Sequence, residues 1–140
     1  MNEKQSYDDL CESDLIEILN KTEFVFGKYL RAVRQMKRIS IRELAKAVNK
    51  TPTYISDIEK GNNKPPEKKL LDEIIFYLNL EEYTDIVKNN LYDLAAKERN
   101  DIPADIKEYI MKNETLLKAI RVTKNKPNDQ QVWRQLLERA

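Results

Sequence analysis

Apolar residues recur three or four positions apart in a series of short segments, the spacing that places side chains on one face of an α-helix. Stretches at 62–66, 99–103 and 124–128 interrupt this pattern and predict turns or loops. With two glycines and 35% charged residues, the chain has little material for a turn-rich β fold. The sequence therefore predicts an all-α fold, with helices over about residues 8–21, 23–37, 41–48, 51–60, 66–78, 81–97, 104–112 and 114–122, and a last helix capped by Asp129.

Two neighbouring helices in this series carry signals at both ends. Ser40 and Thr51 stand at N-cap positions, where a hydroxyl oxygen accepts an otherwise unpaired backbone amide. Pro52 suits the first position of a helix, because no amide is needed there. Asn49 and Gly61 follow the two helices and tolerate the left-handed backbone that ends them. Two helices joined by so short a turn are typical of the unit that places one helix in the major groove of DNA.

Further residues of this region follow the pattern of a known family. They are Phe26-Gly27-x-x-Leu30-Arg31-x-x-Arg34, Leu44-Ala45, Tyr54-Ile55-Ser56-x-Ile58-Glu59-x-Gly61 and Pro65. On these residues, the segment 24–80 resembles the Cro/C1-type helix-turn-helix family of bacterial and phage repressors, also called the XRE family. The resemblance implies a five-helix, lambda repressor-like DNA-binding domain in a transcriptional regulator.

A second stretch extends the resemblance to about residue 121. It consists of Leu94-Ala95-Ala96-Lys97-Glu98-Arg99 and Ile102-Pro103-Ala104-Asp105-Ile106, and it is similar to an extension in a prokaryotic branch of the family. We expect three parts: an acidic N-terminal helical extension over 1–22, the helix-turn-helix domain over 23–80, and a helical C-terminal extension over 81–140. The last part offers more apolar surface than a lone domain requires, and it is the candidate dimerisation region. Trp133 could anchor that interface or fill a core.

Charge is distributed unevenly along the chain. Residues 1–23 hold two Lys against seven acidic residues, for −5, and residues 24–69 hold twelve basic against four acidic residues, for +8. Residues 70–140 hold eleven against thirteen, for −2, so the total is +1. A basic face can simply be solvated, but here it coincides with the helix-turn-helix, as expected of a protein that binds phosphates.

Composition argues against several other functions. The chain has no histidine, the commonest general base and metal ligand, and no Gly-rich phosphate loop, so we expect neither an enzyme nor a metal or other cofactor. Its single cysteine, Cys11, allows no internal disulfide and suits a reducing cytoplasm. No apolar run approaches 18 residues, so we expect a cytoplasmic protein without a membrane span.

The recognition helix is expected over about Thr51–Lys60, where the family motif places base-reading positions at Pro52, Thr53 and Asp57. Thr53 can bond a base edge or touch a thymine methyl, while Pro52 offers apolar contact alone. Asp57 is repelled by phosphates unless it accepts from cytosine N4 or holds a basic neighbour. Tyr54 is also close to the bases in this arrangement. Specificity can therefore depend on Tyr54, on Arg42 or on DNA shape.

Phosphate contacts are easier to predict. The N-termini of the two motif helices expose amides and carry hydroxyl residues, and basic or amide side chains lie beside them. Each lysine taken alone could be an ordinary solvated side chain. The expected phosphate contacts are Ser40, Arg42, Lys50, Thr51, Ser56, Lys60, Asn62, Asn63 and Lys64.

Arg34 and Glu59 resemble DNA-proximal charges, but the family pattern pairs the two positions inside the domain. We therefore expect a structural ion pair that sets the angle of the recognition helix. Removing one partner would leave the other poorly compensated.

Two functions from different classes remain open. One is a homodimeric regulator that binds double-stranded DNA, most simply a repressor of phage or mobile-element type. The other is a protein-interaction module, such as an antitoxin or an effector-binding inhibitor, that uses 1–22 or 81–140 as its working surface. An antitoxin can also bind its own promoter, so the two functions overlap.

Overall fold

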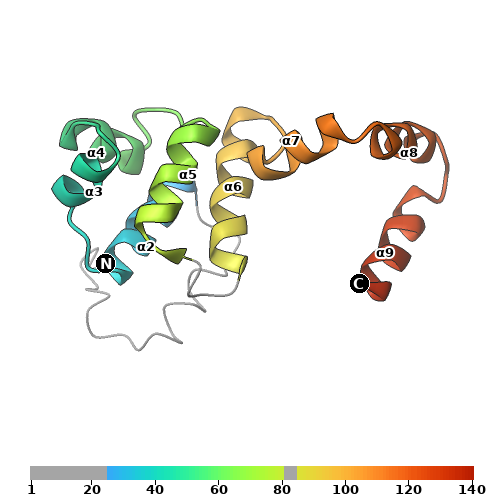
Figure 1. The fold of residues 1–140 in the computed structure, drawn as a ribbon, viewed down its shortest axis with the longest axis horizontal. Coiled ribbons are helices and arrows are strands. Elements are labelled where there is room, and N and C mark those ends of the chain that lie inside the picture. The colour runs from blue at the N-terminus through green and yellow to red at the C-terminus, as the bar shows by residue number, and fades with distance from the viewer. Residues whose placement is uncertain (1–24, 81–84) are drawn as a thin grey trace. The chain divides into compact units, whose positions relative to one another are not determined.

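The computed structural model describes residues 25–80 and 85–140, so the predicted helix over 8–21 and Cys11 lie outside the described residues. Within the described ranges the chain forms helices and no strand, which confirms the all-α prediction. The helices are α2 (Phe26–Met36), α3 (Ile41–Ala47), α4 (Pro52–Lys60), α5 (Lys68–Tyr77), α6 (Asp85–Arg99), α7 (Ala104–Lys112), α8 (Glu114–Lys124) and α9 (Asp129–Arg139) (Figure 1).

The chain divides by packing into two units, of which the first ends at Ala104. In this unit α3 and α4 lie side by side, and α5 lies between them and α6 in the view of Figure 1. Apolar side chains from all five helices, α2 to α6, meet in one core because the predicted helical stripes face inward. Side chains with 0% exposure are Tyr29, Leu30, Val33, Leu44, Ile55, Ile74, Val87 and Leu91.

Helix α6 is part of this first unit. From the sequence, the helix-turn-helix domain could end at residue 80 or at residue 97, and in the structure α6 contacts α2. The amide of Asn90 donates a hydrogen bond to the Tyr29 hydroxyl at 3.2 Å, and the Tyr92 hydroxyl donates to the carboxylate of Asp72 on α5. Burial raises the pKa of Tyr29 to about 12, and the hydrogen bond from Asn90 opposes this rise.

Gly27 allows α2 and α4 to approach each other closely. A Cβ atom at this position would lie 2.4 Å from the carbonyl oxygen of Ile58 and 2.6 Å from that of Glu59. These oxygens belong to the backbone of α4, so a side chain could be accommodated only if a helix moved. The glycine therefore helps to set where α4 lies on α2.

The second unit, Asp105–Ala140, contains α8, α9 and all but the first residue of α7. Asn113 caps α8 by accepting a hydrogen bond from the amide of Leu116 at 3.0 Å. The expected cap of α9 was wrong by one residue, since the N-cap is Asn128 and Asp129 already lies in the helix. Throughout this fully described unit no side chain is buried, and Trp133 is half-buried. The most exposed large apolar residues here are Tyr109, Met111, Val122, Leu136 and Leu137.

Candidate nucleic-acid interface

The two motif helices have the predicted caps. The Ser40 hydroxyl accepts the amide of Glu43 at 3.1 Å at the start of α3, and the Thr51 hydroxyl accepts the amide of Tyr54 at 3.1 Å at the start of α4. Asn49 has φ 56° in the turn between them. Because each hydroxyl accepts a bond through its oxygen, its own hydrogen is available to donate to a phosphate.

Gly61 ends α4 with φ 79°, in the left-handed region, as predicted. The backbone of the residues that follow returns to α4. The amides of Asn62 and Asn63 donate to the carbonyl of Asp57 at 2.8 and 3.3 Å. The loop that holds three of the expected phosphate contacts, Asn62 to Lys64, is thereby held against the last turn of the recognition helix.

Helix α4 is buried on one face and open on the other. Ile55 and Ile58 are 0% and 1% exposed, while Pro52 and Thr53 lie open at its first turn. Tyr54, Ser56 and Asp57 are half-buried at the border between the two faces. Of the four residues expected to lie near the bases, Pro52 and Thr53 are therefore the most accessible, and Tyr54 and Asp57 are less so.

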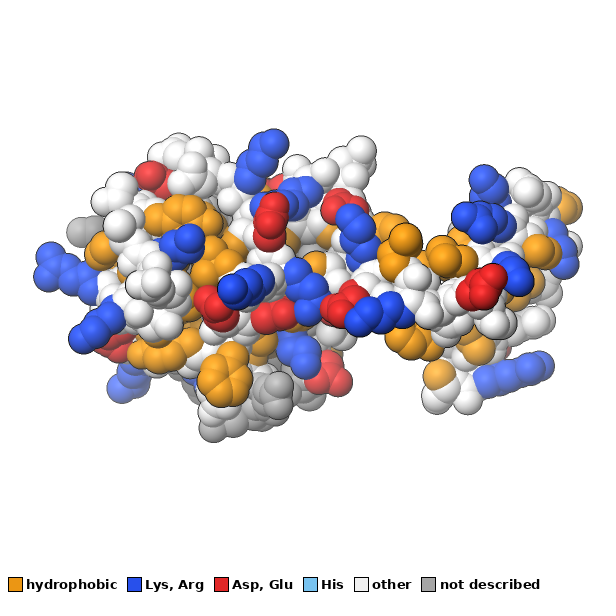
Figure 2. All heavy atoms as spheres, turned by 45° about the horizontal axis from the view of Figure 1, so that its top comes forward, with side chains coloured by type: hydrophobic (Ala, Val, Ile, Leu, Met, Phe, Trp, Pro, Cys, Tyr) orange, Lys and Arg blue, Asp and Glu red, His pale blue; other side chains and the backbone are white. Residues whose placement is uncertain are grey.

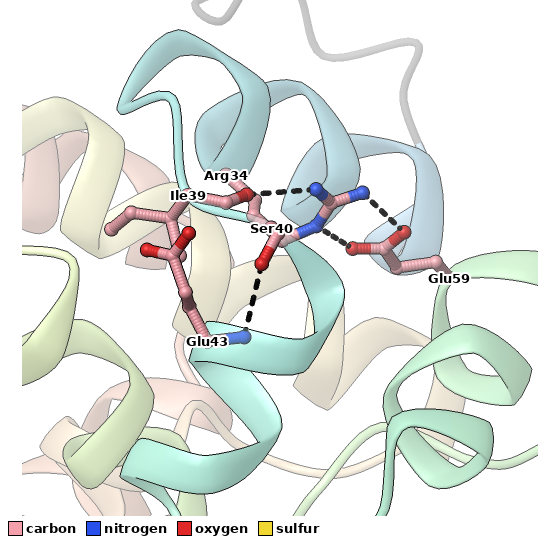
Figure 3. Close-up of polar contacts among 5 residues, drawn as sticks. All are labelled: Arg34, Ile39, Ser40, Glu43 and Glu59. Atoms are coloured by element: carbon pink, nitrogen blue, oxygen red, sulfur yellow. Dashed lines mark hydrogen bonds and ion pairs between the residues drawn. The ribbon is translucent and has the colours of Figure 1, made fainter.

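Arg34 connects three parts of the domain (Figure 3). Its Nε and Nη2 atoms donate to the two carboxylate oxygens of Glu59 at 2.6 and 3.0 Å, and Nη1 donates to the carbonyl of Ile39 at 2.9 Å. The side chains of Arg34 and Glu59 are 9% and 5% exposed. This bidentate pair joins α2 to the end of α4, and the third bond holds the residue just before Ser40. Arg34 and Glu59 therefore pair inside the domain, as the resemblance implied, and both side chains are largely buried.

A groove of about 490 Å³ brings together some of the expected contacts from different elements. Lys50 and Tyr54 line one side, with the Lys50 ammonium 5.4 Å from the centre of the Tyr54 ring. Lys64 lines it from the loop after α4, together with the basic residues Lys69 and Arg99 and the acidic residues Glu67 and Glu73. Figure 2 shows many Lys and Arg side chains projecting from the surface of this unit, with acidic side chains among them.

A second, smaller hollow of about 180 Å³ lies beside the buried ion pair. Ser56 and Lys60 line it from α4, and Arg31 lines it from α2. Arg31 is exposed and was not among the expected phosphate contacts. Its place beside Lys60 depends on how α2 crosses α4, which no local sequence signal reveals. Arg42 is also exposed, on α3, and lines neither hollow.

The described residues offer no group of three or more His, Cys, Asp or Glu side chains arranged to hold a metal ion. In the same part of the chain, no helix combines the length and apolar character needed to cross a membrane.

Comparison with known protein families gives a match to part of the chain. Residues 30–75 match the family model described as helix-turn-helix, a segment that runs from α2 through α3 and α4 into α5. No curated protein and no solved structure matches the chain.

Proposed function

Residues 30–75 form a helix-turn-helix of the Cro/C1 type, a DNA-binding unit, and from this premise we propose that the protein is a sequence-specific transcriptional regulator. Repression is the simplest mode, because a protein seated in a promoter blocks access to it. The observation that carries the proposal is that the first turn of α4 is accessible to a partner. The capped N-termini of α3 and α4 and exposed basic side chains belong to the same unit.

In this proposal the first turn of α4 enters the major groove. Thr53 bonds a base edge or contacts a thymine methyl, and Pro52 contributes apolar contact. Asp57 is half-buried, so its carboxylate has a smaller part in base reading than the exposed Thr53. With few base-reading groups of this kind, a share of the specificity would come from DNA shape.

The phosphate backbone would be held from both sides of α4. Ser40, Thr51 and the amides beside them bind phosphates at helix N-termini, and Lys50, Lys60 and the 62–64 loop add charge and amide donors. If about five phosphates are neutralised per protomer, the logarithm of the binding constant falls with the logarithm of salt concentration with a slope of roughly −4 to −5.

We further propose that the protein acts as a homodimer through its C-terminal helices. The second unit has 36 residues and no buried side chain, whereas units of fewer than about 40 residues usually need oligomerisation or a similar aid to be stable. Figure 2 shows hydrophobic side chains open at the surface of this unit. A second copy would cover them, and it would also supply the second recognition helix, about 34 Å away, that two half-sites require.

The same uncovered helices keep the protein-interaction alternative open. In that alternative an unrelated partner covers α7 to α9, and DNA binding serves only to control the protein's own promoter. Alanine variants at Lys50, Thr53 and Lys60 distinguish the two, because all three are exposed in the domain and their loss leaves the core intact. If the protein is a transcriptional regulator, the variant with all three residues replaced by alanine folds normally and loses both DNA binding and cellular activity. Cellular activity that survives the loss of DNA binding would favour the alternative.

A further inference from the structure

The last turn of α6 makes two contacts with backbone groups of the helix-turn-helix domain. Glu98 Oε1 accepts a hydrogen bond at 2.9 Å from the amide of Phe26, the first residue of α2, for which Val25 provides no side-chain cap. The neighbouring residue, Arg99, donates from Nε to the carbonyl of Pro65 at 3.0 Å, and its Nη2 donates to the same oxygen. Two adjacent side chains thus connect the end of α6 to the start of α2 and to the loop that precedes α5.

The contact between Arg99 and the Pro65 carbonyl also bears on the loop that precedes Pro65. Pro65 is buried and directly follows the exposed loop Asn62 to Lys64. The start of this loop is held by α4, through the carbonyl of Asp57. Its far end is held by Arg99. Both ends of a proposed phosphate-binding loop are therefore fixed, one by the recognition helix and the other by α6.

The geometry of Arg99 argues against a direct contact with DNA. Its side chain is 31% exposed, two of its nitrogens are directed at the Pro65 carbonyl, and Nη1 lies 3.9 Å from Glu67 Oε1. A guanidinium that reads a phosphate presents its donors outward in a fork. Here the donors face the protein's own backbone.

We propose that Arg99 is a positioning residue for DNA binding, which holds the loop from Asn62 to Lys64 in the conformation that contacts phosphate. The proposal rests on the proposed function and extends it to a residue outside the helix-turn-helix segment. Without Arg99 the Pro65 carbonyl loses its charged donor, and the loop samples other conformations. Binding then requires the loop to be ordered again, which weakens affinity without removing a phosphate contact.

The test compares Arg99→Ala and Arg99→Lys with Lys97→Ala in the full-length protein. Lys97 is an exposed cation two residues away on the same helix, so its loss matches the change in net charge. The probe is a mixed-sequence DNA duplex of about 30 base pairs, long enough for two half-sites one helical turn apart. Affinity is measured by fluorescence anisotropy over a range of salt concentrations. Amide chemical shifts of residues 62–64 are recorded without DNA, and thermal unfolding is followed for each variant.

We expect Arg99→Ala to bind about three- to tenfold more weakly than Lys97→Ala, a difference of about 0.7–1.4 kcal/mol, which matches the net contribution of one hydrogen bond. The salt slopes of the two variants should be equal, and the amide shifts of residues 62–64 should change in Arg99→Ala alone. Arg99→Lys keeps the positive charge and most of the aliphatic side chain but loses the planar guanidinium group that donates from two nitrogens. It should be intermediate, and it keeps the test decisive if the alanine variant does not fold.

Three results would overturn the positioning role. These are equal affinity of Arg99→Ala and Lys97→Ala, unchanged loop amide shifts, or a salt slope for Arg99→Ala that is smaller by about 0.9, which would mark Arg99 as a direct phosphate contact. A wild-type protein that binds no duplex would instead overturn the proposed function itself, so the two failures are distinguishable.

Discussion

Replacing Glu59 by alanine should destabilise the first unit severely. The change removes the partner of Arg34 Nε and Nη2 and leaves a guanidinium, 9% exposed as a side chain, with only the Ile39 carbonyl as an acceptor. The charge of Arg34 would then be buried without compensation, or α2 and α4 would have to separate to hydrate it.

The magnitude follows from the burial of the pair. Breaking a buried ion pair by removing one partner costs about 3–5 kcal/mol, whereas an exposed pair contributes about 0–1 kcal/mol. For a domain of about 60–100 residues, each kcal/mol lowers the Tm by roughly 4–8 °C. We therefore expect Glu59→Ala to lower the Tm of the unit by more than about 10 °C, and to weaken DNA binding wherever the unit is still folded.

The assay is thermal and urea unfolding followed by circular dichroism, with Glu73→Ala as the matched control. Glu73 is an exposed glutamate on α5, so its loss changes the charge equally and should alter stability by no more than about 0.5 kcal/mol. The reasoning would be refuted if Glu59→Ala unfolded at the same temperature as Glu73→Ala. A variant that kept its stability but lost DNA binding would show that Glu59 acts at the DNA surface.

Further predictions concern packing, pH and assembly. Gly27→Ala should cost about 1–3 kcal/mol in unfolding experiments, because its Cβ would overlap the Ile58 carbonyl, and an unchanged Tm would contradict this close approach. The Tyr29 pKa is raised from 10.0 to about 12, so its contribution to stability is complete below pH 10 and is lost as pH rises toward 12. Tyr29→Phe should therefore reduce the fall in the free energy of unfolding over that pH range. Equal falls in the wild type and the variant would speak against the raised pKa. Leu136→Lys on the exposed face of α9 should shift sedimentation toward monomer, whereas the control Gln135→Lys should not, and identical profiles would place the dimer contact elsewhere.

The sequence was sufficient to locate the helix-turn-helix because its signals are local. An N-cap hydroxyl acts on an amide three residues away, and a left-handed residue acts on its own backbone, so Ser40, Asn49, Thr51 and Gly61 could be identified one at a time. The Arg34–Glu59 pair spans 25 positions and was accessible only through the family resemblance.

What the sequence could not reveal are contacts between distant residues in which one partner is a backbone group. Glu98 and Arg99 look like ordinary solvated charges at a helix end, yet they bind backbone atoms 72 and 34 positions away. A carbonyl or amide is present at every residue and gives no pattern to detect. Arg38 was missed for a related reason: it has φ 56°, but nothing in its side chain favours the left-handed region.

Footprinting of the full-length protein on DNA that flanks its own gene, at two salt concentrations, tests the central claim most directly. A dimer with two recognition helices should protect two segments one helical turn apart, about 34 Å, on one face of the duplex. Its binding constant should fall with salt with a slope of roughly −8 to −10, about twice that of one half-site. Protection of no segment, or binding that is insensitive to salt, would contradict a protein that reads DNA through α4.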